Sequence, residues 1–239
     1  MDPLYLDNHL LVVVKPPGLL SQADRTGDDD LLSRGKHYLK ERFDKPGDVF
    51  LGLVHRLDRP ASGVMVLART SKAAGRLSRA FRERRVEKRY LALVEGRLTG
   101  EGERVDHLLK ENERVRIVDA GHPKAKRAVL RWKVLGVEDG LSLVEVGLLT
   151  GRPHQVRVQM AALDTPLLGD LRYGAARELD GRNLALHAYR LAFEHPVRRE
   201  PMDFRAPPPA TWEGRFAPQI ERLMNDPSAP PASGKTGPI

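Results

Sequence analysis

The chain has 239 residues, of which 41% are hydrophobic and 30% charged, and it contains no cysteine. The composition excludes a chain that is disordered throughout, and the lack of cysteine excludes disulfides and thiolate metal sites. The sequence has no signal-peptide pattern and no apolar stretch of the roughly 18 to 20 residues that a membrane span needs. We therefore expect a cytoplasmic protein. Forty Lys plus Arg residues against 32 Asp plus Glu residues give a net charge of +8, which favours a polyanionic partner such as nucleic acid.

Short apolar runs bounded by turn residues recur along the chain. They predict strands, in chain order, at residues 4–6, 10–14, 49–54, 64–68, 86–94, 128–137, 141–149 and 184–193. Asp139-Gly140 is typical of a hairpin turn, so the strands on either side of it are expected to pair. Residues 101–127 are polar and charged, and we expect short strands there with an exposed loop over 121–127.

Three segments have the spacing of helices. The first lies within residues 28–43, and the third covers 154–163, with Pro153 suited to its first turn. The second covers 71–85, with Ser71 as the predicted N-cap, an apolar stripe and an arginine-rich opposite face. This basic face has two open interpretations, a nucleic-acid surface and an ordinary solvated helix face.

No internal repeat or linker divides the first 224 residues. We therefore expect one mixed α and β domain over residues 1–224, followed by a disordered C-terminal tail over 225–239, where proline, serine and glycine dominate.

One carboxylate, Asp58, stands between Arg56 and Arg59 in the turn between two predicted strands. The turn reads His-Arg-Leu-Asp-Arg-Pro-Ala-Ser-Gly over residues 55–63. A rigid scaffold could present Asp58 to a ligand, with the arginines available for phosphate. The alternative is a surface turn whose Asp bonds to its own backbone, and this segment alone does not decide between the two.

Tyr90 follows Lys88-Arg89 on a predicted strand. Such a tyrosine is often a half-buried strand residue. It could also stack on a base or accept a proton near a cationic neighbour.

A second polar segment reads Gly-Arg-Pro-His-Gln-Val-Arg over residues 151–157. It gathers Arg152, His154, Gln155 and Arg157 at a predicted helix start, where backbone N–H groups favour anions. An ordinary helix N-terminus is the alternative. The sequence contains no metal-binding histidine pattern, so we expect no metal site, and it contains no dinucleotide fingerprint.

Taken in order, these segments resemble the signature of the RluA-type pseudouridine synthases, over about residues 4 to 210. The matching segments are 15–18 (Lys-Pro-x-Gly), 55–58 (His-Arg-Leu-Asp), 88–90 (Lys-Arg-Tyr), 151–157, 168–174 (Leu-Gly-Asp, then Tyr-Gly) and 186–196 (Leu-His-Ala, then His-Pro). Each match alone is weak, but six in the expected order are specific.

The resemblance implies an α+β fold with a mixed, largely antiparallel sheet in two halves, flanking helices and a central catalytic cleft. It implies an RNA pseudouridine synthase, an isomerase that converts specific uridines of structured RNA, either ribosomal or transfer RNA, into pseudouridine. The resemblance also implies that the reaction needs no metal and no organic cofactor. Two alternatives remain. The chain could be a catalytically inactive RNA-binding relative, or a glycosidase or nucleoside hydrolase, which would need a second catalytic carboxylate.

The resemblance also assigns roles to the catalytic candidates. Asp58 is the expected nucleophile, Tyr90 stacks beside the uracil and assists removal of the C5 proton, and Arg157 pairs with Asp58 and keeps it ionised. Arg56 is expected to fill or support the gap left by a flipped uridine.

The remaining expectations concern RNA binding and assembly. Further expected RNA-binding residues are Lys88, Arg89, Arg152, His154 and Gln155. Ala61 departs from the family pattern, which usually has Thr there. The chain begins directly in the catalytic region, so we expect no small N-terminal RNA-binding domain and look to residues 72–85 and 110–127 for target recognition. We expect a monomer.

Overall fold

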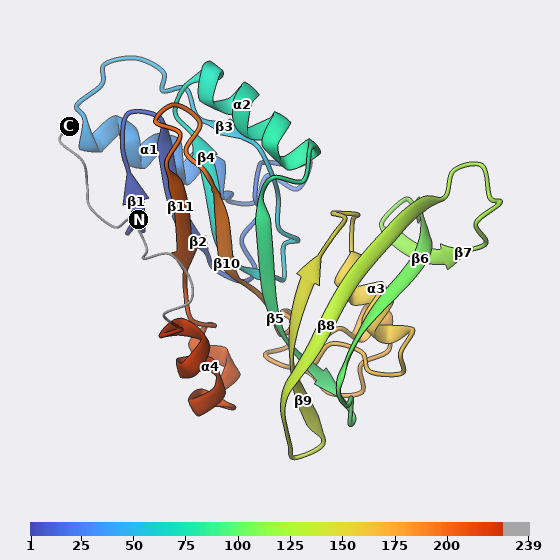
Figure 1. Cartoon of the computed structure of the whole chain (residues 1–239). Coiled ribbons are helices and arrows are strands. Elements are labelled where there is room, and N and C mark those ends of the chain that lie inside the picture. The colour runs from blue at the N-terminus through green and yellow to red at the C-terminus, as the bar shows by residue number, and fades with distance from the viewer. Residues whose placement is uncertain (227–239) are drawn as a thin grey trace. The chain divides into compact units, whose positions relative to one another are not determined.

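A computed structural model describes residues 1–226 of the chain (Figure 1). The tail predicted at 225–239 therefore lies, apart from its first two residues, outside the described residues. The chain divides into two compact units, one formed mainly by Met1–Glu87 and Tyr189–Ala206, the other by Lys88–Ala188 and Pro207–Asn225. The single catalytic domain predicted over 1–224 stays a prediction.

The first unit holds short strands and two helices. In chain order these are β1 (Tyr5–Leu6), β2 (Leu10–Lys15), α1 (Leu31–Arg42), β3 (Gly52–Leu53), β4 (Ser62–Ala68), α2 (Ser71–Arg82), most of β10 (Leu186–Glu194) and β11 (Pro201–Arg205). Strands β1, β2, β4 and β10 are neighbours in that order, β11 pairs with β10, and β3 pairs with β4.

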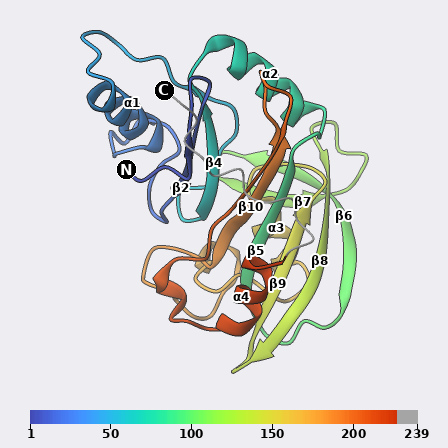
Figure 2. The ribbon, with the colours of Figure 1, turned by 60° about the vertical axis from the view of Figure 1, so that its left-hand side comes forward.

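Helices α1 and α2 cover opposite faces of the β2–β4 pair. Val12 and Val66 are opposite each other in the antiparallel register and pack in one core cluster with Leu77 of α2. The alternate side chains of Leu11 and Leu67 lie beside Gly35 of α1. Because successive side chains of a strand point to opposite faces, the two helices lie on either side of the strands, as Figure 2 shows.

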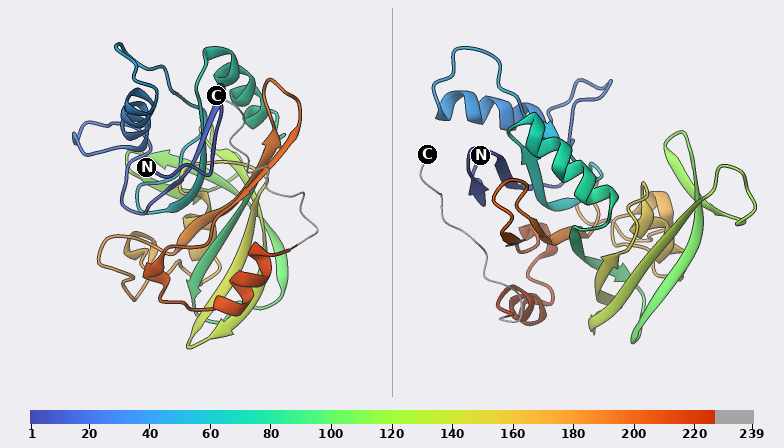
Figure 3. Two further views of the ribbon diagram at one scale, coloured as in Figure 1. Left: turned by 90° about the vertical axis from the view of Figure 1, so that its left-hand side faces the viewer. Right: turned by 45° about the horizontal axis from the view of Figure 1, so that its top comes forward.

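The second unit is built on a long antiparallel ribbon. Its elements are β5 (Glu87–Glu95), β6 (Glu101–Glu111), β7 (Arg114–Val118), β8 (Lys126–Glu138), β9 (Leu141–Leu148), α3 (Gln155–Ala161), the 3-10 helices 171–173 and 210–212, and α4 (Ala217–Met224). The strand order is β5-β9-β8-β6-β7, and β6 and β8 run side by side in Figure 3. The predicted hairpin is confirmed, with φ of 50° at Asp139 and 70° at Gly140, as a primed turn requires.

Several element boundaries differ from the sequence prediction. The buried strand predicted at 49–54 is only the half-buried, two-residue β3, and the N-cap of α2 is Thr70, whose side chain accepts from the Ala73 N–H. Of the short strands expected over residues 101–127, β7 with its five residues is one, but β6 is a long strand of 11 residues. Six of its 11 residues are charged, which hid the strand from a search for apolar runs.

Two further elements were not predicted. β11 contains Pro201 and Asp203, which are rare in strands, and it forms only by pairing with β10. α4 follows a proline-rich segment that suggested no structure.

The predicted α+β class with a largely antiparallel sheet is confirmed. Within residues 1–226, no helix is long and apolar enough to cross a membrane.

Candidate active site

Asp58 lies in the short loop between β3 and β4 of the first unit. Its side chain is half-buried, between the buried Leu57 and the exposed Arg59. The Ala61 N–H donates to the Asp58 carbonyl oxygen at 3.1 Å, which closes a tight turn. The carboxylate is therefore carried by a short, well-defined loop that leads directly into the fully buried strand β4.

The loop that follows β2 holds the Asp58 turn on both sides. The hydroxyl of Ser21 donates to the Leu57 carbonyl at 2.8 Å and accepts from the Leu57 N–H at 3.2 Å. The Gly18 N–H donates to the Arg59 carbonyl at 2.9 Å, and Arg59 Nε donates to the Gly18 carbonyl at 3.1 Å. These four bonds fix the backbone before and after Asp58.

Lys15, the last residue of β2, is a buried cation beneath the same turn. Its Nζ donates to the carbonyl oxygens of Pro16, Leu19 and Arg59 at 3.0, 2.8 and 3.1 Å, and the residue has no exposed surface. Burial lowers the pKa of Lys15 to about 7, while the negative charge of Asp58 acts to raise it. The sequence signature included Lys15 but assigned it no role.

Lys15 makes stability depend on pH in a predictable direction. The pKa of Lys15 is lower in the folded protein than in the unfolded chain, so between about pH 7 and about pH 10 the unfolded chain binds more protons. The free energy of unfolding should therefore rise with pH across this window. In Lys15→Met we expect that rise to be smaller, by on the order of 1–3 kcal/mol.

Urea unfolding of both proteins at about pH 7 and about pH 9.5 measures the difference. Every other titrating group is common to the two proteins and cancels in the comparison. An identical pH dependence would show that Lys15 keeps an ordinary pKa in the fold.

The two arginines beside Asp58 have different surroundings. Arg59 Nη1 pairs with Asp28 at 2.7 Å. Arg56 is exposed, and within residues 1–226 it makes no hydrogen bond or ion pair. Arg56 is therefore the one whose guanidinium remains available to an external anion.

His55, the first residue of the motif, ties it to β4 and α2. Its Nε2 accepts the Val66 N–H at 3.0 Å, and its ring stacks on Phe81 with 4.6 Å between centroids and 20° between planes. The end of α2 is thereby fixed against the segment that carries Asp58.

In the second unit, Arg157 forms a buried pair with Asp170. Arg157 Nε and Nη2 each donate to one carboxylate oxygen at 2.7 Å, and the two side chains are 7% and 1% exposed. This two-pronged geometry fixes the guanidinium plane. Asp170 was part of the sequence signature without an assigned role, and it is a positioning residue for Arg157.

Tyr173 supports both Arg157 and His154. The Arg157 Cζ lies 4.9 Å from the centre of the Tyr173 ring. The Tyr173 hydroxyl accepts the Val115 N–H at 3.0 Å and lies 2.7 Å from His154 Nδ1, to which it can donate its own hydrogen. Burial raises the pKa of Tyr173, so the phenol keeps that hydrogen at neutral pH.

Gln155 closes the turn that leads into α3. Its Oε1 accepts from the Thr150 hydroxyl at 2.8 Å and from the Arg152 N–H at 3.0 Å. His154 is the N-cap, with a left-handed φ of 51°, so Pro153 precedes the cap and does not lie in the first helical turn as predicted. The Gln155 Nε2 is buried and has no hydrogen-bond partner among the described residues.

Strand β5 carries Lys88, Arg89 and Tyr90. Tyr90 is 7% exposed and lies opposite Val146 of β9. A Cβ built on Gly147 would be 3.2 Å from Arg89 Nη1, and one built on Gly151 would be 3.2 Å from Lys88 Nζ. The side chain of Arg89 thus lies over Gly147 and that of Lys88 over Gly151, which places Lys88 against the 151–157 segment. Burial lowers the pKa of Lys88.

The predicted residues thus form two groups. Arg56 and Asp58 are in the first unit, and Lys88 to Tyr90, Arg152, His154, Gln155 and Arg157 are in the second. The pairing of Arg157 with Asp58 and the central cleft stay predictions. Sequence reasoning assigned no role to the supporting residues Lys15, Ser21, Asp170 and Tyr173. Lys15, Asp170 and Tyr173 lie inside the matched signature segments, and this position is the sequence signal that could have identified them as site residues.

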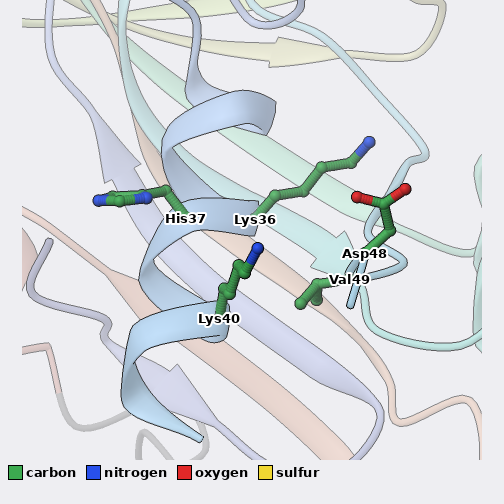
Figure 4. A pocket seen from close by; sticks show the side chains of 5 residues that line it. All are labelled: Lys36, His37, Lys40, Asp48 and Val49. Carbon is green, nitrogen blue, oxygen red and sulfur yellow. The ribbon is translucent and has the colours of Figure 1, made fainter. Parts of the chain in front are cut away.

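A hollow of about 230 Å³ on the first unit lies apart from these residues. It is lined by Lys36, His37, Lys40, Asp48 and Val49, shown in Figure 4. Its charged lining differs from the apolar walls of most small-molecule sites, and none of the predicted site residues contributes to it. Among residues 1–226, no group of three or more His, Asp or Glu residues could hold a metal ion.

Comparisons with known proteins point to the same family as the sequence signature. The family model described as RNA pseudouridylate synthase matches residues 9–162. The chain is 34% identical to ribosomal large subunit pseudouridine synthase D of Vibrio parahaemolyticus, over 87% of this chain and 67% of that protein. It is 36% identical to the uncharacterized RNA pseudouridine synthase YjbO of Bacillus subtilis, over 87% and 73%.

Solved structures give the same answer for the fold. The structure of human RNA pseudouridylate synthase domain containing 4 has a TM-score of 0.74 and 25% identity, over 93% of this chain and 92% of that one. Human RNA pseudouridylate synthase domain containing 1 has a TM-score of 0.66 and 29% identity, over 86% and 82%. The chain therefore belongs to the RNA pseudouridylate synthase family, and its predicted enzyme class, an RNA-modifying isomerase, is confirmed.

Proposed function

We propose that this protein converts specific uridines of structured RNA into pseudouridine, with Asp58 as the nucleophile. The observation that carries the proposal is the clamped Asp58 turn, whose backbone is held by Ser21, Gly18 and Lys15. A carboxylate on an ordinary surface turn needs no buried cation beneath it. Ribosomal RNA is the favoured substrate class, because relatives over 30% identical are named for the large ribosomal subunit, and transfer RNA is the alternative.

The reaction is an isomerisation that needs no external reactant. The Asp58 carboxylate forms a bond to C1′ of the ribose as the bond between C1′ and N1 of uracil breaks, and uracil rotates. C5 then forms a bond to C1′ as the bond between C1′ and Asp58 breaks, C5 loses its proton, N1 gains one, and Asp58 is released unchanged. Tyr90 stacks on the uracil, and it assists removal of the C5 proton.

Arg157 pairs with Asp58 in this proposal and keeps the carboxylate ionised. The pair with Asp170 uses Nε and Nη2, and a guanidinium carries five N–H donors, so one guanidinium can serve both carboxylates. Asp170 and Tyr173 hold the guanidinium plane still while it does so.

The RNA contacts of this proposal surround the reacting uridine. Arg56 fills the gap that the flipped uridine leaves, which offsets part of the few kcal/mol that unstacking costs. Lys88, Arg89, Arg152, His154 and Gln155 bind the flanking RNA. The cytoplasmic location and the monomeric state stay predictions.

Release of tritium tests the function. Unmodified large-subunit ribosomal RNA and transfer RNA, transcribed with uridine tritiated at C5, are incubated with the purified protein. Because the new bond replaces the C5 hydrogen, each conversion releases one tritium into water. We expect release from one of the two RNA classes. RNA binding without release from either class would instead identify an inactive RNA-binding relative.

Loss of Arg157 should reduce chemistry far more than binding. We expect Arg157→Ala to lose nearly all single-turnover activity while its RNA affinity changes only a few-fold, because the proposed partner of Arg157 is Asp58 and not a phosphate. Removing one member of a buried pair also threatens folding, so the double variant Arg157→Met/Asp170→Leu provides the folded comparison. Equal losses of activity and affinity would make Arg157 an RNA-contact residue.

A further inference from the structure

One exposed face of α2 carries cations without partners. Lys72, Arg79, Arg82 and, just past the helix end, Arg84 are exposed, and none of their side chains makes a hydrogen bond or ion pair with another described residue. The one acidic residue between 71 and 85 is Glu83, which is held by Arg85 through Oε2 at 3.0 and 2.7 Å. The charge of Glu83 also acts on Arg79 and Arg82, but one carboxylate against this many cations leaves the face with a net positive charge.

The cations form a row along the helix. Lys72, Arg76, Arg79 and Arg82 recur every three or four residues, which places them along one side. The row is about 15 Å long at 1.5 Å of rise per residue. Arg76 is fixed by its bond to the Pro196 carbonyl at 2.7 Å. The other side of the helix is buried through Ala73, Leu77 and Ala80, so the row is presented by a rigid element.

The row has an end that leads to Asp58. Phe81, next to Arg82 in sequence, stacks on His55, and His55 begins the motif that carries Asp58. A strand of RNA bound along α2 would thus arrive at the proposed nucleophile of the same unit. Helix α2, His55 and Asp58 all belong to the first unit.

Helix stability alone does not explain the row. Arg79 and Arg82 lie in the last turn, where a cation interacts favourably with the helix dipole. Stabilisation of the helix is therefore an alternative explanation for the presence of these two arginines. Lys72 is the second residue of the helix, where the dipole disfavours a cation and an anionic ligand is favoured. Cations near both ends of α2 are expected if the helix binds a polyanion, whereas the helix dipole would favour cations at the C-terminal end alone.

We propose that Lys72, Arg79 and Arg82 of α2 bind backbone phosphates of the RNA strand that leads to the reacting uridine. The inference rests on the proposed function, because it names the part of the surface that holds that substrate. The ligand class is the RNA phosphodiester backbone, so this contact supplies affinity and register, and not base selection.

Salt-dependent RNA binding tests the row. The variant Arg79→Gln/Arg82→Gln removes two cations, and Gln has a helix propensity close to that of Arg. The control Arg131→Gln/Arg215→Gln removes the same charge from exposed arginines that pair with Glu103 and Glu213. Affinity for unmodified large-subunit ribosomal RNA, transcribed in vitro, is measured between roughly 50 and 200 mM salt.

We expect the α2 variant to bind about tenfold more weakly than the control and to lose about 1 to 2 from the slope of log affinity against log salt. Its single-turnover rate at saturating RNA should equal that of the control. Lys72→Gln should weaken binding in the same direction without lowering the unfolding midpoint, a pattern that a purely helix-stabilising cation cannot produce.

The failures are distinguishable. If the α2 variant and the control share one affinity and one slope, the row does not bind RNA and this inference is overturned, whatever the tritium assay shows. If the α2 variant weakens binding but wild type releases no tritium from either RNA class, the inference stands and the proposed function fails.

Discussion

Asp58→Asn is expected to form no detectable pseudouridine while binding RNA within a few-fold of the wild-type affinity. The amide is nearly isosteric with the carboxylate but is not a nucleophile, and the hydrogen bonds that Lys15 and Ser21 donate to this turn are accepted by backbone carbonyls. The loop should therefore keep its conformation. Single-turnover tritium release and RNA affinity, measured on the same preparation, separate the two effects.

The matched control is Asp48→Asn, which removes an exposed carboxylate of the same unit from a position outside the proposed site. It should keep the wild-type rate and affinity. Wild-type activity in Asp58→Asn would show that another group is the nucleophile. Loss of both activity and RNA affinity would show that Asp58 organises the binding surface instead.

Asp170→Asn is expected to lower the free energy of unfolding by about 3–5 kcal/mol. The pair of Asp170 with Arg157 is almost fully buried, and neutralising the carboxylate leaves the guanidinium without its counter-charge. The desolvation cost of that charge is then no longer offset. Denaturant unfolding of the variant and wild type at one pH gives the difference directly.

The exposed pair of Arg131 with Glu103 supplies the contrast. Glu103→Gln breaks a bond of the same 2.7 Å length, but the two side chains are 65% and 41% exposed. We expect a change of about 0–1 kcal/mol there. Similar effects of Asp170→Asn and Glu103→Gln would mean that the Arg157–Asp170 pair is not buried in solution.

Local patterns predicted the elements whose burial follows sequence periodicity. The β8–β9 hairpin was predicted because Asp139-Gly140 needs two positive φ angles, a requirement that few residue pairs meet. The apolar stripe of α2 was predicted because its buried side follows the helical period. β11 could not be predicted in this way, since it contains Pro201 and Asp203 and exists because β10 supplies its hydrogen-bond partners.

The candidate catalytic residues could be predicted from the sequence, but the hydrogen bonds that hold the surrounding segments in place could not. Asp58, Tyr90 and Arg157 lie in motifs that the sequence shows directly. The clamp of Lys15 on the Arg59 carbonyl joins positions 44 residues apart, and nothing in either segment alone indicates that bond. The same holds for Tyr173, which reaches the Val115 N–H across 58 residues. Contacts of this kind are set by tertiary packing, which local sequence patterns do not encode.

A map of pseudouridine across total RNA tests the central claim most directly. The map compares a strain that lacks this gene with its parent and with deletion strains that express either wild type or Asp58→Asn. The account predicts a uridine in ribosomal or transfer RNA that is modified in the parent and in the wild-type complement, and unmodified in the deletion strain and with Asp58→Asn. Four identical maps, or a site restored by Asp58→Asn, would contradict it.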